Sequence, residues 1–443
     1  MNTSKQNIYY KNLINKIESK KVNIGVIGIG YVGLPLALSF SQKGINVIGF
    51  DINKNVINTL KEGHSHINHI DSIEVKEGVN SKKFFPTDDF SFINKIDVIL
   101  ICVPTPLNDK REPDLSFLTN SISLIKSYLK KGQLISIEST TYPGTTYEVV
   151  KPLIELNNLK IGNNFFLTYS PEREDPGNQD FKRSEIPKIV GGDTRFCAEI
   201  GKKTYELINS NVILVSSSKT AEMTKLLENV FRAVNIGLIN ELKVVAEHLD
   251  LDINEIINAA SSKPFGFKPF FPGPGVGGHC IPIDPIYLSW KAKKEFNLQI
   301  KFIDLADEIN SRMPNHVINK LKVSLEKRSK KIKGCKILIL GISYKKNIDD
   351  CRESPSLEIT KSLIKMGANV SYNDPFFPFF YFDNDKAECL KCLDLTIKNI
   401  ENQDCVILLT DHDIYKYQMI EKHSKLIIDT RGRFNRSEKI IKA

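Results

Sequence analysis

Short apolar runs alternate with segments of helical period in the first half of the chain. The apolar run at 23–28 is followed at once by the glycine-rich string GIGYVG (28–33), an apolar helix and a second strand at 47–50 that ends at Asp51. This order predicts a βαβ unit. Further strands are predicted at 98–103, 134–138 and 165–169. Each of them precedes a loop rich in Pro or Thr, which is typical of the ligand edge of a doubly wound sheet.

A similar pattern recurs near the end of the chain. A strand at 336–340 precedes a helix near 356–366, and a further strand ends at Asp374. The apolar run at 405–409 matches the run at 98–102 in position and character. We therefore expect two Rossmann-like halves.

The region between the two halves lacks strand patterns. Residues 220–260 are predicted to be helical throughout, with Leu226, Val230, Val234 and Leu238 at helical spacing. A long amphipathic helix of this kind often carries a dimer contact. The predicted fold class is therefore α/β, with two Rossmann-like doubly wound domains joined by a central helical domain.

Composition narrows the class of protein. The chain has 443 residues, of which 41% are hydrophobic and 26% charged, so it should fold into two or three domains. The net charge of +9 comes from lysines spread along the chain, and no block of like charges indicates a nucleic-acid partner. Such an excess suits an anionic small substrate, although an ordinary solvated surface is the simpler cause.

The sequence shows little evidence of a membrane helix, a signal peptide, a disulfide framework or a metal site. No apolar run approaches the length of about 18 residues that a membrane helix needs, and 8–21 reads as a lysine-rich helical extension, not a signal peptide. The eight cysteines lack dense disulfide spacing, which fits a reducing compartment. Cys389 and Cys392 form a lone CxxC without a second pair or a suitably spaced histidine, so no metal site is expected. We expect a cytoplasmic protein with no membrane partner.

The first glycine string has the spacing of a dinucleotide-binding fingerprint. Gly28, Gly30 and Gly33 would provide the tight turn, the close approach to a pyrophosphate and the close packing of helix on strand. The helix that begins there supplies amide donors for phosphate groups. Asp51 would accept hydrogen bonds from the ribose hydroxyls and repel a 2′-phosphate, so NAD is expected and not NADP.

Cys280 lies in the string GPGVGGHCIPIDP (273–285). A thiol between glycines and prolines belongs to a tightly bent loop, not to a packed helix or strand. Beside a nicotinamide cofactor, a loop-borne thiol indicates an oxidation through a covalent sulfur adduct, as when an alcohol is taken to an acid. The competing interpretation is a buried, inert thiol.

These motifs make the chain similar to the UDP-glucose/GDP-mannose dehydrogenase family of nucleotide-sugar 6-dehydrogenases. It resembles most the UDP-N-acetylglucosamine 6-dehydrogenase branch, over residues 23–433. The motifs that carry the resemblance are GIGYVGLPLA, CVPTP (102–106), ESTTYPGTT (138–146), SPEREDPGN (170–178), AEMTKLLENVFRAVNI (221–236), GPGVGGHCIPIDP and YKKNIDDCRESP (344–355).

The resemblance implies a two-step, four-electron oxidation of the C6 alcohol of a sugar to a carboxylate, with two NAD per turnover. It also implies separate domains for NAD and for the nucleotide end of the substrate. The expected boundaries are 1–21 for an N-terminal helical extension, 22–215 for the NAD-binding Rossmann domain, 216–330 for the central helical domain with the cysteine loop, and 331–443 for the C-terminal Rossmann-like domain that binds the UDP-sugar.

The resemblance assigns catalytic roles residue by residue. Cys280 would capture the C6 aldehyde as a thiohemiacetal and then carry a thioester. Lys225 and Asn229, one helical turn apart, would stabilise the oxyanion at C6. Asp284 matches an acid that orders a water, and Glu172 matches the base for thioester hydrolysis. Which of Asp284, Glu172 or Lys225 moves each proton stays open.

Binding residues follow from the same resemblance. Thr140 matches a catalytic threonine that helps to hold the water and the nicotinamide end. The residues expected to bind NAD are Gly28, Ile29, Gly30, Tyr31, Val32, Gly33, Asp51, Thr105, Thr140 and Arg352. Those expected to bind the UDP-sugar are Glu172, Lys225, Asn229, Lys263, Lys268, Gly277, Lys345 and Arg431. Lys263 and Lys268 are candidates for pyrophosphate contacts, and Arg431 has the guanidinium fork that suits a phosphate.

The identity of the sugar stays open. Pro176 stands where UDP-glucose enzymes usually carry a glutamate, and this difference favours a 2-acetamido sugar. UDP-N-acetylglucosamine is the expected substrate, for a surface polysaccharide such as a capsule or O-antigen. UDP-N-acetylmannosamine, UDP-N-acetylgalactosamine and UDP-glucose are alternatives. A two-electron dehydrogenase and a non-catalytic NAD-sensing protein are competing classes, and the presence of Cys280 and Lys225 argues against both. A homodimer or larger homo-oligomer is expected.

Overall fold

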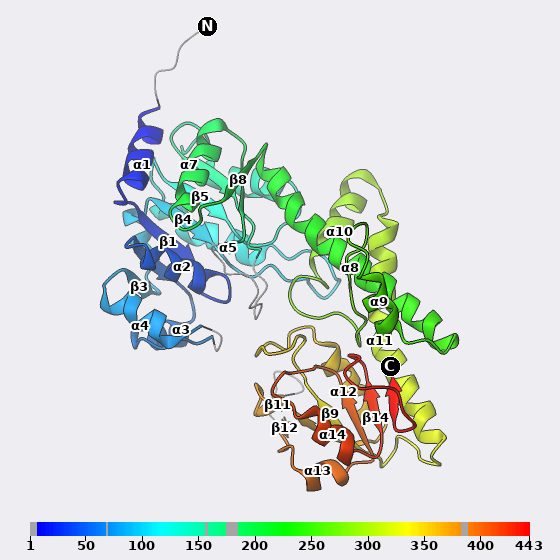
Figure 1. The fold of residues 1–443 in the computed structure, drawn as a ribbon. Coiled ribbons are helices and arrows are strands. Elements are labelled where there is room, and N and C mark those ends of the chain that lie inside the picture. Colours follow the sequence, from blue (N-terminus) through cyan, green and yellow to red (C-terminus); the bar gives the residue numbers. More distant parts are fainter. Residues whose placement is uncertain (1–6, 68–69, 156–157, 174–184, 382–388) are drawn as a thin grey trace. The chain divides into compact units, whose positions relative to one another are not determined.

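The computed structural model describes residues 7–67, 70–155, 158–173, 185–381 and 389–443 (Figure 1). The chain divides into two compact units. The first comprises Met1–Glu228 with Ile286–Asn297, and the second comprises Asn229–Pro285 with Leu298–Ala443. No helix in the described ranges is long and apolar enough to cross a bilayer.

The first unit is built on an eight-stranded sheet. Its strands in spatial order are β3 (Phe84–Thr87), β2 (Asn46–Phe50), β1 (Asn23–Ile27), β4 (Val98–Ile101), β5 (Leu134–Ile137), β6 (Phe166–Tyr169), β7 (Lys188–Gly192) and β8 (Val212–Val215). Neighbouring strands are parallel except β6 and β7. The order 3-2-1-4-5-6 is that of a Rossmann sheet, in which ligands bind where the order reverses between β1 and β4.

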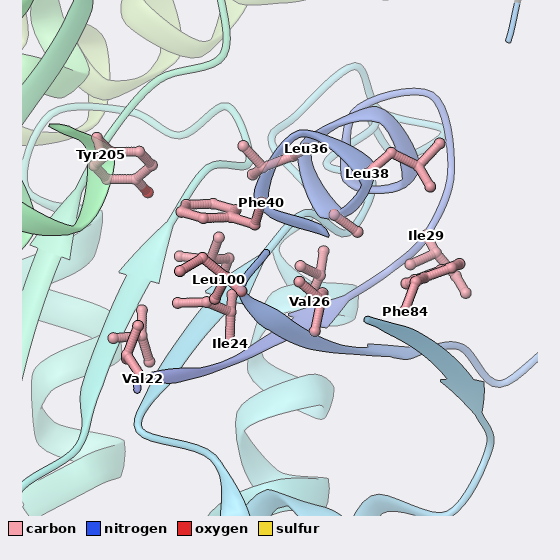
Figure 2. Close-up of a cluster of buried hydrophobic side chains, with 14 of the residues drawn as sticks. Val22, Ile24, Val26, Ile29, Leu36, Leu38, Phe40, Phe84, Leu100 and Tyr205 are labelled. Carbon is pink, nitrogen blue, oxygen red and sulfur yellow. The ribbon is translucent and has the colours of Figure 1, made fainter. Parts of the chain in front are cut away.

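Both faces of the central strands β4, β5 and β6 are buried, which explains their continuous apolar runs in the sequence. Successive strand residues alternate between two cores: Val98 and Leu100 pack in one, whereas Ile99 and Ile101 pack in the other. Figure 2 shows the first core, where Phe40 from the helix after the glycine string lies among strand residues. Helices on both faces therefore make the sheet doubly wound.

Of the helices of the first unit, the N-terminal extension and the helix after the glycine string were predicted from the sequence. The helices are α1 (Ile8–Glu18), α2 (Gly33–Gln42), α3 (Lys54–Lys61), α4 (Ser72–Asn80), α5 (Ser116–Ile125), α6 (Lys151–Glu155), α7 (Arg195–Glu206) and, from Ile286 onward, α10 (Asp284–Phe296). Short turns of other helix types are η1 (Phe90–Lys95), η2 (Lys126–Tyr128) and η3 (Thr145–Val150), the last a π-helix. The predicted N-terminal extension is helical as α1, which packs on α7.

The second unit contains a smaller parallel sheet. Its strands in spatial order are β10 (Asn369–Asn373), β9 (Lys336–Leu340), β13 (Cys405–Leu408), β14 (Ile427–Asp429) and β15 (Ile440–Lys442). Ile339 and Ile407 face one core, and Leu338 and Leu408 face another. The helices are α9 (Ile253–Ala260), α11 (Lys301–Glu326), α12 (Pro355–Lys365), α13 (Ile397–Glu401) and α14 (Tyr417–His423), and a hairpin is formed by β11 (Phe379–Tyr381) and β12 (Cys389–Lys391).

The predicted fold class is confirmed, with one correction in the middle of the chain. The expectation of a continuous helix over 220–260 is wrong, because α8 (Ser218–His248) and α9 are separate helices. Asp250 takes a left-handed φ of 56°, which ends the first helix. The carboxylate of Asp252 then accepts a hydrogen bond from the Asn254 amide (2.8 Å) and caps the second helix.

Candidate active site

The glycine string fits a dinucleotide. Gly28 has φ +83°, and a Cβ added at Gly33 would lie 1.9 Å from the Gly28 carbonyl oxygen, so both positions require glycine. A Cβ added at Gly30 would have no neighbour within 4 Å, which leaves room beside the backbone. Helix α2 begins at Gly33 without a side-chain cap, so no side chain competes with a phosphate group for its N-terminus.

The acid expected to bind ribose is fixed at the end of β2. One oxygen of Asp51 accepts a hydrogen bond from the Ile29 amide (3.2 Å) and the other from the Asn53 amide (2.9 Å). Ile29 is buried in the core, whereas Tyr31 and Val32 are half-buried. The strand ends therefore bring the carboxylate to the glycine string, as the βαβ pattern predicts.

Three predicted residues of the first unit follow the carboxyl ends of β4, β5 and β6. Thr105 is buried in the loop after β4, and Thr140 is half-buried after β5. Glu172 follows β6, and its side chain is 14% exposed. The carboxyl ends of parallel strands meet at one edge of the sheet, so all three belong to the ligand edge.

Glu222 on α8 was missed by sequence reasoning. Its buried carboxylate accepts hydrogen bonds from the amides of Gly144 and Thr146 (2.5 and 2.8 Å) and from the hydroxyls of Thr141 and Thr146 (3.2 and 2.7 Å). Burial raises its pKa to about 7, against the effect of these hydrogen bonds. The residue lies three positions before Lys225, so helical spacing could have marked it.

Helix α8 carries the predicted lysine and amide one turn apart. Lys225 and Asn229 are each only 8% exposed. The Asn229 amide nitrogen donates to Asp284 Oδ2 at 2.6 Å, and Asp284 is buried at the start of α10. The structure therefore brings Asn229 and Asp284 into direct contact within the second unit.

The cysteine loop packs against the segment that contains the YKKNIDDCRESP motif. The Gly278 amide donates to the Arg352 carbonyl (2.9 Å), and a Cβ added at Gly277 would lie 2.7 Å from the side chain of Tyr344. Cys280 is exposed, and its carbonyl accepts from the Asp284 amide at 2.8 Å. Two motifs far apart in sequence thus lie together, beside the exposed Cys280.

A buried amide pair fixes the start of this loop. The Gly273 amide donates to Asn240 Oδ1 (3.1 Å), and the Asn240 amide nitrogen donates to Asn310 Oδ1 (2.9 Å). Neither asparagine was singled out from the sequence, because an asparagine inside a helix gives no sign that it is buried.

The predicted cations of the second unit have different surroundings. Arg352 forms a forked pair with Asp350, with Nη2 2.6 Å from Oδ2. Arg431 donates from Nε to the Leu409 carbonyl (2.6 Å), and burial lowers its pKa. Lys345 is half-buried, whereas Lys263 and Lys268 are exposed.

The predicted residues thus divide between the two units. The first holds the glycine string with Asp51, Thr105, Thr140, Glu172 and Lys225, and the second holds Asn229, Lys263, Lys268, Gly277, Cys280, Asp284, Lys345, Arg352 and Arg431. Pro176 lies outside the described residues. No group of three potential metal ligands occurs in the described part of the chain.

Comparison with known protein families covers most of the chain. The UDP-glucose/GDP-mannose dehydrogenase family matches in three parts. Its NAD binding domain matches residues 22–209, its central domain 219–312 and its UDP binding domain 338–436.

Individual relatives match four fifths of the chain or more. The UDP-N-acetyl-D-glucosamine 6-dehydrogenase of Pseudomonas aeruginosa is 36% identical over 81% of this chain and 83% of its own length. The UDP-N-acetyl-D-mannosamine dehydrogenase of Pyrococcus horikoshii is 35% identical over 93% of this chain and 96% of its own. A solved structure of the UDP-D-ManNAc dehydrogenase from Pyrococcus horikoshii has a TM-score of 0.85 at 33% identity, covering 94% of this chain and 97% of that one. The chain therefore belongs to the UDP-glucose/GDP-mannose dehydrogenase family, and it is an NAD-dependent UDP-sugar dehydrogenase.

Proposed function

We propose that this enzyme oxidises the C6 alcohol of UDP-N-acetylglucosamine to the carboxylate through a covalent adduct on Cys280. The observation that carries the proposal is the exposed thiol on a glycine-rich loop of an NAD-dependent UDP-sugar dehydrogenase. A relative 36% identical is named UDP-N-acetyl-D-glucosamine 6-dehydrogenase, which supports the choice of sugar. The product would supply a uronic acid to a surface polysaccharide.

The glycine string, Asp51, Thr105, Thr140 and Arg352 would hold NAD, which accepts a hydride in each of two oxidations when bound. Cys280 adds to the C6 aldehyde to form a thiohemiacetal, and loss of a hydride and a proton gives the thioester. Lys225 and Asn229 donate hydrogen bonds to the developing oxyanion.

Hydrolysis completes the reaction. Asp284 orders a water, and Glu172 takes its proton as the water attacks the thioester carbon. The C–S bond breaks, and Cys280 leaves as the thiolate. The UDP moiety and the sugar are held by Lys345, Arg431 and Gly277, with Lys263 and Lys268 at the pyrophosphate.

UDP-N-acetylmannosamine is the second candidate, because a relative 35% identical over 93% of this chain is named a dehydrogenase for that sugar. UDP-N-acetylgalactosamine and UDP-glucose are further alternatives. The test is kcat/KM for NADH formation with all four substrates. We expect UDP-N-acetylglucosamine to exceed each other sugar by at least about tenfold, or 1.4 kcal/mol. A tenfold preference for any other sugar would contradict the assignment.

We propose a homodimer through α8 in the cytoplasm, where NAD and nucleotide sugars are available. Leu227, Phe231, Leu238, Leu242 and Val245 are exposed and recur at spacings of three, four or seven, so they form one apolar stripe. Leu238→Asp places a charge in this stripe and should give a monomer by light scattering, with an unchanged circular dichroism spectrum. A wild-type monomer, or a dimeric variant, would contradict this proposal.

A further inference from the structure

A buried ionic cluster lies at the carboxyl edge of the first sheet. Lys188, the first residue of β7, places its ammonium 2.7 Å from Glu138 Oε2 and 3.3 Å from Glu172 Oε2. The side chains of Lys188, Glu138 and Glu172 are 10%, 0% and 14% exposed. One cation thus joins the residue after β5 to the glutamate expected to act as base.

The far side of the cluster is rigid. The hydroxyl of Tyr205 donates to the second oxygen of Glu138 and lies 2.7 Å from the Ser136 hydroxyl. Figure 2 shows Tyr205 beside the apolar core that contains Phe40. Glu138 is therefore held from both sides and gives Lys188 a fixed anchor.

The surroundings of the cluster decide which of its groups carry a charge. Burial alone would lower the pKa of Lys188, but the negative charges of Glu138 and Glu172 outweigh burial and raise it. Burial raises the pKa of the neighbouring Cys102 thiol, so that group stays neutral. Burial also raises the pKa of Tyr205, whose hydroxyl therefore keeps its proton. Burial also raises the pKa of Glu138, although the charge of Lys188 and the hydrogen bonds from Lys188 and Tyr205 oppose this shift. One ammonium is thus shared by two carboxyl groups.

The backbone around Glu172 is clamped as well. The Lys188 ammonium reaches the Pro171 carbonyl at 3.3 Å. The Arg173 guanidinium pairs with both oxygens of Glu228 on α8 (2.6 and 3.1 Å) and donates to the Pro187 carbonyl at 2.7 Å. The residues on both sides of Glu172 are thus fixed, and Lys188 restrains its carboxylate.

We propose that Lys188 is a positioning residue that holds Glu172 ionised and oriented for the hydrolysis of the thioester. This inference rests on the role proposed for Glu172. A glutamate has three rotatable bonds, and an adjacent cation both selects one orientation and favours the charged form that can accept a proton. The step is the attack of water on the thioester carbon, with cleavage of the C–S bond, release of the Cys280 thiolate and transfer of the proton of water to Glu172.

The test compares variants whose folding can be separated from their chemistry. Lys188→Met leaves Glu138 buried without its cation and could unfold the protein, so Glu138→Gln/Lys188→Met serves as the charge-balanced version. Lys188→Arg keeps a cation. Lys16→Met is the control, because Lys16 pairs with the nearly buried Asp97 (2.7 Å) at the opposite edge of the same sheet.

The readouts are the NADH burst, the intact mass of the quenched enzyme and the pH–rate profile, all with UDP-N-acetylglucosamine. Without Lys188 we expect a burst of two NADH per active site, a steady-state rate reduced at least tenfold and a stable adduct on Cys280. The acidic limb of the profile should move to higher pH, because the cation that favours ionised Glu172 is lost. Lys188→Arg should restore most of the rate, and Lys16→Met should form no adduct.

The variant Glu172→Gln distinguishes a failure of the role proposed for Lys188 from a failure of the role proposed for Glu172. If it accumulates the adduct and both Lys188→Met variants do not, the role of Lys188 is overturned while that of Glu172 stands. If Glu172→Gln itself turns over without an adduct, the proposed function of Glu172 fails first. Should the double variant also fail to bind NAD, the cluster is structural, and the positioning role is overturned.

Discussion

Lys243 on α8 is buried in the second unit without a hydrogen-bond partner among the described residues. It lines a cavity of about 20 Å³ together with Asp429 and Lys442, which pair with each other at 2.9 Å. Burial lowers the pKa of Lys243 to about 8, although the charge of Glu247 opposes the shift. At pH 7 the folded protein therefore carries a desolvated ammonium.

Lys243→Met should stabilise the second unit at pH 7 by about 1–3 kcal/mol, because the folded state no longer holds this charge. The folded pKa lies below the unfolded value of 10.5, so the wild type gains stability as pH rises from about 8 to 10.5. The advantage of the variant should therefore shrink over that range. Denaturant unfolding of both proteins at pH 7 and pH 10 measures this difference in the free energy of unfolding.

Lys320→Met is the matched control. Lys320 is 2.7 Å from Glu247 and partly exposed, so its loss removes a real partner and should destabilise the protein modestly. A Lys243→Met protein that is less stable than the wild type at pH 7 would show that the ammonium binds a partner in the cavity.

At single residues, a surrounding motif was the signal that drew attention to a position, and the roles assigned there stay predictions. Lys225 was predicted from the motif at 221–236, and the structure places it on α8, largely buried. Lys188 and Lys243 look like ordinary surface lysines in the sequence, because a charged residue at a strand or helix position reads as solvent-facing. Both lysines are buried by carboxylates and turns that are distant in sequence. The hydrophobic periodicity of the sequence cannot predict such contacts.

At the scale of elements, strands were predicted more accurately than helix ends. The core strands β4, β5 and β6 lie within one or two residues of their predicted ranges. A strand that is buried on both faces has apolar residues at every position, so its sequence is a continuous apolar run that is easy to recognise. The break between α8 and α9 was missed. The Asp252 cap was a visible signal, but the apolar helical pattern continued on both sides of it.

The junction of β1 and α2 provides a test at this scale. Gly30→Ala should leave the unfolding temperature unchanged, since its Cβ meets no atom within 4 Å, but weaken NAD binding at least about tenfold by occupying the place of the pyrophosphate. Gly33→Ala should lower the unfolding temperature, because its Cβ would overlap the Gly28 carbonyl. Differential scanning fluorimetry and a titration with NAD distinguish the two. Unchanged NAD affinity in Gly30→Ala would contradict pyrophosphate binding by this loop.

At the scale of the whole molecule, the sequence indicated two Rossmann-like halves and an intervening helical region, and both sheets are present. The division at 215/216 and 330/331 stays a prediction. The compact units change at Asn229 and again around Ile286–Asn297, so α10 from Ile286 onward belongs with the first unit although it follows the cysteine loop. The chain returns to the first unit at α10 because of tertiary contacts. For example, the Tyr287 hydroxyl donates a hydrogen bond to the Pro106 carbonyl (2.9 Å). No local sequence pattern predicts such a contact.

A four-electron oxidation through Cys280 can be measured as the yield of NADH per UDP-N-acetylglucosamine consumed. The enzyme should form two NADH per sugar and a carboxylate product. Cys280→Ser should still bind NAD but form no acid, because an alcohol cannot carry the thioester. One NADH per sugar with release of the aldehyde, or full acid formation by Cys280→Ser, would contradict the covalent mechanism.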